Sequence, residues 1–228
     1  MIAVPLPPGL PRPTAILWDW DNTLVDAWAG VQAGMNAALR AFGRPEWSLE
    51  QVRARARLSL RESFPALFGA EWEHARDLFY AEVRARHLEF IMPLPGTVAA
   101  LERGALWPMG VVSNKQGPIL RAEAAHLGWA GHFGVLVGAG DAVADKPAAA
   151  PVLMALERLG VAPGPAVWFI GDTGVDMQAA RAAGCSAVLL GDAAHDGGIA
   201  ALAPDAVFPD GHVLAACLHG LAKTPLPA

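Results

Sequence analysis

The chain has 228 residues, of which 54% are hydrophobic and 17% charged, and its formal net charge at pH 7 is −5. This composition excludes a disordered chain, and the negative balance argues against a general nucleic-acid-binding surface. No apolar run approaches the roughly 18–20 residues that are needed to span a bilayer. The amino terminus lacks a signal-peptide pattern, and two cysteines, Cys185 and Cys217, make no disulfide framework. We therefore expect a soluble, cytoplasmic protein with one large core domain, which could carry a smaller insertion.

The first predicted strand covers about residues 14–19 and leads into the motif DWDNTL, which begins at Asp19. Its apolar, β-branched and aromatic residues are typical of a buried strand. Residues two apart in extended backbone point to the same side, so the carboxylates of Asp19 and Asp21 can face one space. Carboxylates are costly to bring together away from water unless a cation or a shared proton compensates them. The pair therefore indicates a site, although both aspartates could instead cap a turn or a helix.

Residues 26–92 have helical patterns with no convincing strand between them. Trp28, Val31 and Met35 recur at helical spacing, and the sequence SLEQ at Ser48 resembles a capping box that opens a second helix. Further helices are expected over about residues 61–67 and 71–90. We therefore predict two domains, a helical cap of residues 27–92 and an α/β catalytic core of residues 1–26 and 93–228.

From residue 93 onward, short apolar segments alternate with helical patterns of 10–15 residues, which implies a parallel, doubly wound sheet. Lys146-Pro147 is expected to open a helix, with proline in the first turn where its missing donor is harmless. The expected strands cover residues 109–112, 135–137, 166–170, 186–190 and 206–208, and the expected helices cover about residues 97–104, 117–127, 146–159, 176–183, 198–203 and 211–221.

Polar residues follow four of the predicted strands. Because the carboxyl ends of parallel strands share one edge of a sheet, one crevice can collect these side chains. Carboxylates, a lysine and small hydroxyls suit Mg²⁺ together with a phosphate, since Mg²⁺ prefers hard oxygen ligands. A carboxylate can then form an aspartyl-phosphate, and a lysine can offer a point charge to the transferring group. The residues are Asp19, Asp21, Ser113, Asn114, Lys146, Asp172 and Asp176.

In their order, these motifs resemble those of haloacid-dehalogenase-superfamily (HAD) phosphohydrolases, and the chain looks most like phosphoglycolate-phosphatase-like members with a helical cap. The resemblance covers nearly the whole chain, including the insertion between the first and second motifs. It implies a Rossmann-like HAD core. Its four motifs are DWDNTL at Asp19, VVSN ending at Asn114, the Lys146-Pro147 element, and GDTGVDMQAARAAG starting at Gly171.

The resemblance implies catalytic roles for three residues. Asp19 would be the nucleophile that takes the phosphoryl group. Asp21 would protonate the leaving oxygen and later activate water. Lys146 would balance the charge of Asp19 and of the phosphate.

The resemblance likewise implies substrate and metal contacts. Ser113, with Asn114 beside it, would bind the phosphoryl oxygens, and Thr23 would steady the loop after the nucleophile on the substrate side. Asp172 would coordinate Mg²⁺, and Asp176 would ligate it directly or through water. Asp19 and the backbone carbonyl of Asp21 would complete the metal site.

Asp21 favours phosphate-ester chemistry, because dehalogenases and phosphonatase-like members of the superfamily carry a different residue at this position. The sequence thus predicts a Mg²⁺-dependent phosphatase that acts on a small phosphorylated metabolite, either phosphoglycolate-like or a sugar phosphate, without nucleic-acid or membrane partners. The open alternatives are a phosphomutase of the β-phosphoglucomutase type, a phosphate-binding or regulatory relative, and a catalytically dead structural relative. The oligomeric state is not readable from the sequence.

Each motif also has a purely structural interpretation. Ser113-Asn114 and Asp172 with Asp176 could cap helices, and Lys146 could be a solvated lysine. His195-Asp196 resembles a catalytic dyad, but no nucleophile is identifiable beside it, so a loop is the preferred interpretation.

Overall fold

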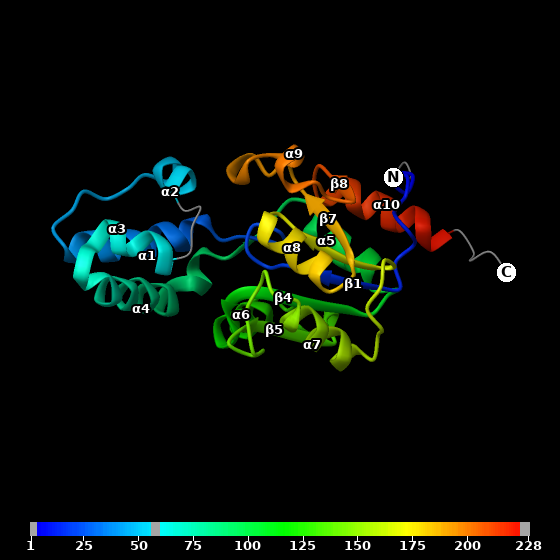
Figure 1. Cartoon of the computed structure of the whole chain (residues 1–228), viewed down its shortest axis with the longest axis horizontal. Helices are drawn as coiled ribbons and strands as arrows, with labels where there is room; N and C mark the ends of the chain where they lie inside the picture. Colours follow the sequence, from blue (N-terminus) through cyan, green and yellow to red (C-terminus); the bar gives the residue numbers. More distant parts are fainter. Residues whose placement is uncertain (1–3, 56–59, 224–228) are drawn as a thin grey trace. The chain divides into compact units, whose positions relative to one another are not determined.

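The computed structural model describes residues 4–55 and 60–223. The chain divides into two compact units (Figure 1), one of Met1–Val25 with Pro93–Ala228 and one of Asp26–Met92. We call them unit 1 and unit 2. The predicted cap range of residues 27–92 lies within unit 2. Among the described residues, no helix combines the length and the apolar character that a membrane span needs.

Unit 1 is built on a six-stranded sheet with the strand order β5-β4-β1-β6-β7-β8, in which all neighbouring strands are parallel. β1 lies in the middle, where Leu17 is opposite Gly110 of β4 and Phe169 of β6. All residues of β1 are buried, as expected for a strand that is covered on both faces. The strands are β1 (Ala15–Trp18), β4 (Met109–Gln116), β5 (Val135–Ala139), β6 (Val167–Gly171), β7 (Ser186–Leu190) and β8 (Ala206–Phe208). This architecture confirms the predicted doubly wound α/β core.

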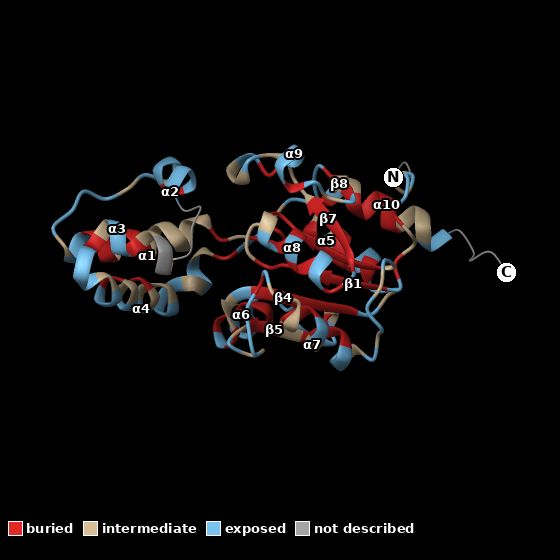
Figure 2. Ribbon diagram, in the orientation of Figure 1, coloured by how far each residue is buried: buried red, intermediate tan, exposed pale blue. Residues whose placement is uncertain are grey.

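Helices cover both faces of the sheet. On one face, α7 (Ala150–Leu159) and α8 (Gly174–Ala182) pack on a buried cluster that includes Leu17 and Phe169. On the other face, α5 (Thr97–Gly104) ends over Ile16 and Trp18 and packs against α10 (Gly211–Lys223). Figure 2 shows the buried strands of unit 1 between helices whose outer faces are exposed. The remaining elements of unit 1 are α6 (Gly117–His126), α9 (Ile199–Leu202), and the short 3-10 turns η2 (Ala130–His132) and η3 (Ala194–Asp196).

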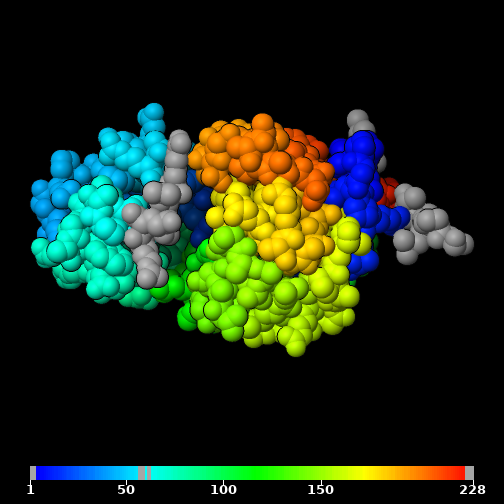
Figure 3. Space-filling model, viewed as in Figure 1, coloured from blue at the N-terminus to red at the C-terminus, as the bar shows by residue number. Residues whose placement is uncertain are grey.

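Residues 4–13, in the proline-rich segment before β1, lie against the rest of unit 1 (Figure 3, blue). Trp168 of β6 donates its indole N–H to the carbonyl of Pro11 at 2.8 Å. Arg12 donates to the carbonyl of Leu221 in α10 at 2.6 Å. These bonds tie the segment to one strand and one helix of the core.

Unit 2 has its own apolar core, formed by a cluster that includes Met35, Phe64 and Phe79. At Gly34, a Cβ atom would lie 2.8 Å from the Phe79 ring, so glycine allows the close approach of two helices, α1 (Trp28–Ala41) and α4 (Trp72–Phe90). The predicted capping box is confirmed, because Ser48 and Gln51 exchange backbone-to-side-chain hydrogen bonds of 2.9 and 3.2 Å. The elements are α1 (Trp28–Ala41), α2 (Leu49–Arg55), α3 (Leu60–Phe68), η1 (Gly69–Glu71) and α4 (Trp72–Phe90). Where the chain passes between the units, β2 (Val25–Asp26) and β3 (Met92–Pro93) form a two-stranded sheet.

The prediction for Lys146-Pro147 is wrong. The peptide bond between these residues is cis, and α7 begins only at Ala150. The Lys146 backbone is instead held by Asn114, whose side chain accepts from the Lys146 N–H at 3.0 Å and donates to its carbonyl at 2.9 Å. Pro151 takes the first-turn position that was expected for Pro147.

Candidate active site

The candidate site lies where the carboxyl ends of the three central strands meet. Asp19 directly follows β1, Asp172 directly follows β6, and Ser113 lies in the carboxyl-terminal half of β4. The sheet grows outward on both sides of β1, which makes this edge the topological switch point where open α/β sheets bind ligands. The Asp19 N–H donates to the carbonyl of Ile170 at 2.8 Å, which ties the end of β1 to β6.

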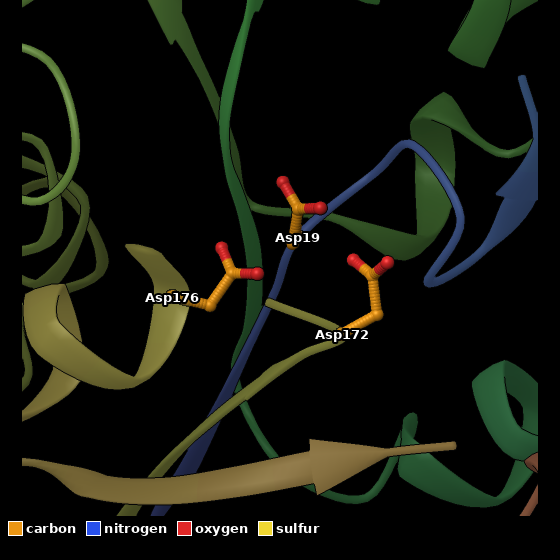
Figure 4. Close-up of side chains that lie close together, drawn as sticks. All are labelled: Asp19, Asp172 and Asp176. Carbon is orange, nitrogen blue, oxygen red and sulfur yellow. The ribbon is translucent and has the colours of Figure 1, made fainter. Parts of the chain in front are cut away.

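Three buried carboxylates, those of Asp19, Asp172 and Asp176, converge at this edge (Figure 4). One oxygen from each lies within 4.8 Å of the other two. The Lys146 ammonium reaches into the same cluster, and its Nζ lies 2.6 Å from Asp19 Oδ1 and 2.6 Å from Asp176 Oδ1. The topology thus brings together residues from three separate segments of the chain, after β1, before α7 and at the β6–α8 turn.

The balance of charge in the cluster is negative. Burial raises the pKa of Asp19 from its usual 3.8 to about 7; Lys146 opposes the rise, and Asp176 and Asp172 add to it. Burial alone would lower the pKa of Lys146, but the carboxylates of Asp176 and Asp19 outweigh it and raise that pKa, so Lys146 stays an ammonium. Burial also raises the pKa of Asp172. Three buried carboxylates around one ammonium leave an excess of negative charge, which a divalent cation would compensate. Their oxygens are also the kind of ligand that such a cation prefers.

Asp176 uses its two oxygens for two purposes. Oδ1 accepts from Lys146, while Oδ2 accepts from the Thr173 backbone N–H at 3.0 Å and the Thr173 hydroxyl at 2.7 Å. Asp176 therefore caps α8, as its structural interpretation proposed, and also faces the carboxylate cluster. A Cβ atom at Gly171 would lie 2.4 Å from the Cβ of Asp176, so this side chain fits only beside a glycine.

Asp172 is held by two side chains. The hydroxyl of Thr23, which is fully buried, donates to Asp172 Oδ1 at 3.2 Å. Thr23 thus supports a carboxylate of the cluster, whereas the sequence analysis assigned it to the substrate side. His195 lies with Nε2 3.3 Å from Asp172 Oδ2, and the hydrogen bond to Asp172 raises the pKa of His195.

His195 is a site residue that the sequence does not reveal. No nucleophile lies beside the pair His195-Asp196 in the chain, because the partner of His195 is Asp172, which lies 23 positions earlier. Asp196 has a separate task, because its Oδ2 accepts from the Gly174 N–H at 2.6 Å and so docks η3 on the start of α8. No local pattern signals either contact.

Ser113 and Asn114 are both predicted to contact the phosphoryl group, but their side chains have different partners in the structure. Ser113 is buried, and its Oγ accepts from the Lys115 N–H at 3.2 Å. Asn114 uses its amide to bracket the Lys146 backbone, as described above. The Asn114 amide is thus bonded to the Lys146 backbone, and a contact of Asn114 with the phosphoryl group stays a prediction.

Asp21 lies nearer the surface, with a side chain 32% exposed where that of Asp19 is 9% exposed. Its Oδ1 is 2.6 Å from the Nζ of Lys115 in β4. Lys115 Nζ also lies 2.6 Å from Oε2 of Glu123 in α6, and the same Glu123 oxygen accepts from the Trp20 indole N–H at 2.7 Å. Lys115 and Glu123 could not be predicted from the sequence, because their contacts join residues of different elements.

The model of the family described as haloacid dehalogenase-like hydrolase matches residues 16–190 of this chain. Among curated proteins, the chain is 35% identical over 181 residues to a phosphoglycolate phosphatase of Xylella fastidiosa (strain 9a5c), covering 75% of this chain and 77% of that protein. It is 34% identical over 205 residues to a phosphoglycolate phosphatase of Shigella boydii serotype 4 (strain Sb227), covering 77% of this chain and 80% of that protein. These matches confirm the predicted resemblance and the prediction of a phosphatase enzyme.

Solved structures agree on the fold. A HAD-superfamily hydrolase from Ehrlichia chaffeensis is similar with a TM-score of 0.63 and 26% identity, over 93% of this chain and 98% of that one. A haloacid dehalogenase-like hydrolase from Streptococcus pneumoniae is similar with a TM-score of 0.78 and 22% identity, over 92% of this chain and 97% of that one. The family match includes Asp19, Lys146, Asp172 and Asp176, while His195 lies beyond it. The chain belongs to the haloacid dehalogenase-like hydrolase family.

Proposed function

We propose that the protein is a Mg²⁺-dependent phosphatase that hydrolyses a small phosphorylated metabolite through an aspartyl-phosphate on Asp19. The observation that carries this proposal is the contact of Asp19 with the buried ammonium of Lys146, inside a cluster of two further carboxylates. The curated relatives that are named phosphoglycolate phosphatase make 2-phosphoglycolate the first substrate to test, and sugar phosphates the second.

The side chains of the cluster fit a magnesium ion. Asp19, Asp172 and Asp176 supply hard oxygen donors within 4.8 Å of one another, and their charge exceeds that of Lys146. We propose that these three carboxylates and the backbone carbonyl of Asp21 hold the ion. When bound, it would neutralise charge on the phosphoryl oxygens. Thr23 and His195 would orient Asp172 as a ligand, since they contact its two oxygens.

In the first step, an Asp19 carboxylate oxygen forms a bond to phosphorus, and the bond between phosphorus and the ester oxygen breaks. The electron pair of that bond goes to the leaving oxygen, which takes a proton from Asp21. Lys146 stays protonated and offsets the charge of the nucleophile and the phosphoryl group. The Ser113 hydroxyl would donate a hydrogen bond to a phosphoryl oxygen.

In the second step, a water molecule attacks phosphorus and gives its proton to Asp21, while the Asp19 carboxylate leaves. Asp21 thereby returns to its protonated state, and inorganic phosphate is the product. The two steps replace one difficult displacement by two easier ones, since an acylphosphate is more labile than the ester from which it forms.

The helical unit 2 is the proposed cap, which would exclude water and select the leaving group. Five of its described arginines lie over aromatic rings of the same unit; among them, Arg53 lies 5.9 Å from the ring centroid of Trp28, and Arg55 lies 4.7 Å from that of Trp47. The proposed compartment is the cytoplasm, where the two free thiols, Cys185 and Cys217, would stay reduced.

The test is phosphate release from a panel of phosphomonoesters, with Mg²⁺ and with chelator. We expect metal-dependent release by the wild type, loss of release in Asp19→Asn with the fold retained, and unchanged release in Asp77→Asn. Asp77 is a matched control because it forms an exposed ion pair with Arg76 on α4, of the kind that contributes little. Undiminished rates in Asp19→Asn would overturn the nucleophile assignment. Isomerisation of a phosphosugar without net phosphate release would favour the phosphomutase alternative.

A further inference from the structure

A chain of buried polar contacts runs from α6 to the proposed proton donor. Glu123 lies on α6 with a side chain that is only 1% exposed. Its Oε2 contacts the Lys115 ammonium at 2.6 Å, and Lys115, which is 11% exposed, contacts Asp21 at 2.6 Å. The contacts join three segments, α6, β4 and the loop after β1, and they lie entirely within unit 1.

Burial of the Glu123 carboxylate costs free energy. A buried carboxylate loses its hydration, and a cationic partner repays that loss only where the geometry is good and further hydrogen bonds are made. Glu123 meets these conditions through Lys115 and the Trp20 indole, which both contact Oε2. Because hydrophobic residues of similar volume would stabilise a helix of this kind equally well, stability alone gives no reason for a carboxylate here.

The contacts of Trp20 and Lys115 constrain Asp21, the proposed proton donor. Trp20 stands between Asp19 and Asp21 in the sequence, and its ring is fully buried in edge-to-face contact with Trp129 and Phe133. The backbone after it is fixed by Asn22 at φ 60° and by a bridge from Asp21 to Val25. The Asp21 backbone is therefore set by the loop, and its carboxylate is set by Lys115.

We propose that Glu123 and Lys115 are positioning residues for Asp21: buried Glu123 holds the Lys115 ammonium, and Lys115 fixes the orientation from which the Asp21 carboxyl group reaches the leaving-group oxygen. This inference rests on the proposed function, in which Asp21 is the proton donor. Without the charge of Glu123, Lys115 loses one of its two anionic anchors, and the contact that fixes Asp21 is free to shift.

The inference makes a prediction that a purely structural role does not. An alkyl alcohol leaves phosphorus as a strong base and needs a proton, whereas nitrophenolate is a stable anion and leaves without one. The value of kcat/KM reports events up to departure of the alcohol, because that release is the first irreversible step. Misplacement of Asp21 should therefore lower kcat/KM for alkyl phosphates much more than for p-nitrophenyl phosphate.

The experiment compares wild type, Glu123→Gln, Lys115→Gln, the double variant, and Glu157→Gln as a matched control that is exposed on α7. The measured quantity is the ratio of kcat/KM for the best alkyl phosphate of the panel to kcat/KM for p-nitrophenyl phosphate. We expect it to fall about 10–100-fold in both single variants, in line with the usual cost of a misplaced or lost general acid. The control should keep the wild-type ratio, and the double variant should match Lys115→Gln, because Glu123 acts through Lys115.

An equal fall for both esters, or an unchanged ratio, would overturn the positioning role while leaving the phosphatase assignment intact. A wild type that hydrolyses neither ester would instead overturn the proposed function. If Glu123→Gln fails to fold, as judged by thermal unfolding, Lys115→Gln carries the test, because Lys115 lies at the edge of the network and its loss leaves Glu123 bonded to Trp20.

Discussion

Replacing the proposed nucleophile should stabilise the metal-free protein above neutral pH. In the folded state the pKa of Asp19 is raised to about 7, whereas in the unfolded chain it should be near the usual 3.8. Between these two values the folded protein holds a proton that the unfolded chain has lost, so unfolding releases a proton. The contribution of Asp19 to the free energy of unfolding therefore falls as the pH rises from about 4 to about 7. Above pH 7 this contribution no longer changes.

The size of this effect follows from the rise in the pKa. A rise in the pKa of Asp19 from 3.8 to about 7 corresponds to a loss of up to about 4 kcal/mol in the free energy of unfolding at pH 8 relative to pH 4. Asp19→Asn removes the titrating group, while Lys146 keeps its second contact with Asp176 at 2.6 Å. We therefore expect the variant to be more stable than wild type at pH 8 by at least about 1 kcal/mol, and the two proteins to converge toward pH 4.

The assay is urea unfolding in chelator at several pH values between about 4.5 and about 8.5, with the free energy of unfolding taken from linear extrapolation to water. Comparison of the two proteins cancels the contribution of titrating groups that do not interact with Asp19. The same difference should shrink when Mg²⁺ is added, because a cation bound by wild type would offset the charge excess. A variant that is less stable than wild type at pH 8 in chelator would refute the reasoning, as would a stability difference that does not change with pH.

Two further substitutions test the support around the carboxylates. Gly171→Ala should lower turnover by about 100-fold, because the new Cβ would lie 2.4 Å from the Cβ of Asp176 and displace it; Gly164→Ala, which meets no atom within 4 Å, is the control, and a fully active Gly171→Ala would contradict the packing argument. Thr23→Val removes the hydroxyl that donates to Asp172 at 3.2 Å and should weaken Mg²⁺ binding about 10-fold in titration calorimetry, whereas unchanged affinity would show that this hydrogen bond does not orient the ligand.

The features that could be predicted from the sequence are those that depend on residues close together in the chain. Asp19 and Asp172 each follow an apolar strand, so the sequence alone predicts that they meet at one edge of a parallel sheet. The helical pattern of residues 26–92 and the capping box at Ser48 were likewise local, and both are found in unit 2.

The contacts that could not be predicted are those that depend on how distant segments approach one another. Thr23 and Asp172 are 149 positions apart, and His195 reaches Asp172 from η3, a turn without a recognisable motif. Asn114 follows Ser113 in the chain, but it faces the Lys146 backbone, because adjacent residues of an extended strand point to opposite sides. Proline's tolerance in a first helical turn predicted a helix start at Lys146-Pro147, whereas the Asn114 contact that holds this turn comes from 32 positions earlier in the chain.

The covalent intermediate is the central claim of this account, and rapid quenching tests it most directly. Wild type and Asp19→Asn would be mixed with the best phosphomonoester of the panel in the presence of Mg²⁺, quenched in acid within one turnover, and reduced with borohydride, which converts an aspartyl-phosphate to homoserine. Peptide mass spectrometry would then locate the modified residue. The account predicts homoserine at position 19 in wild type and at no position in Asp19→Asn. Modification at a different residue, or turnover without any modification at position 19, would contradict it.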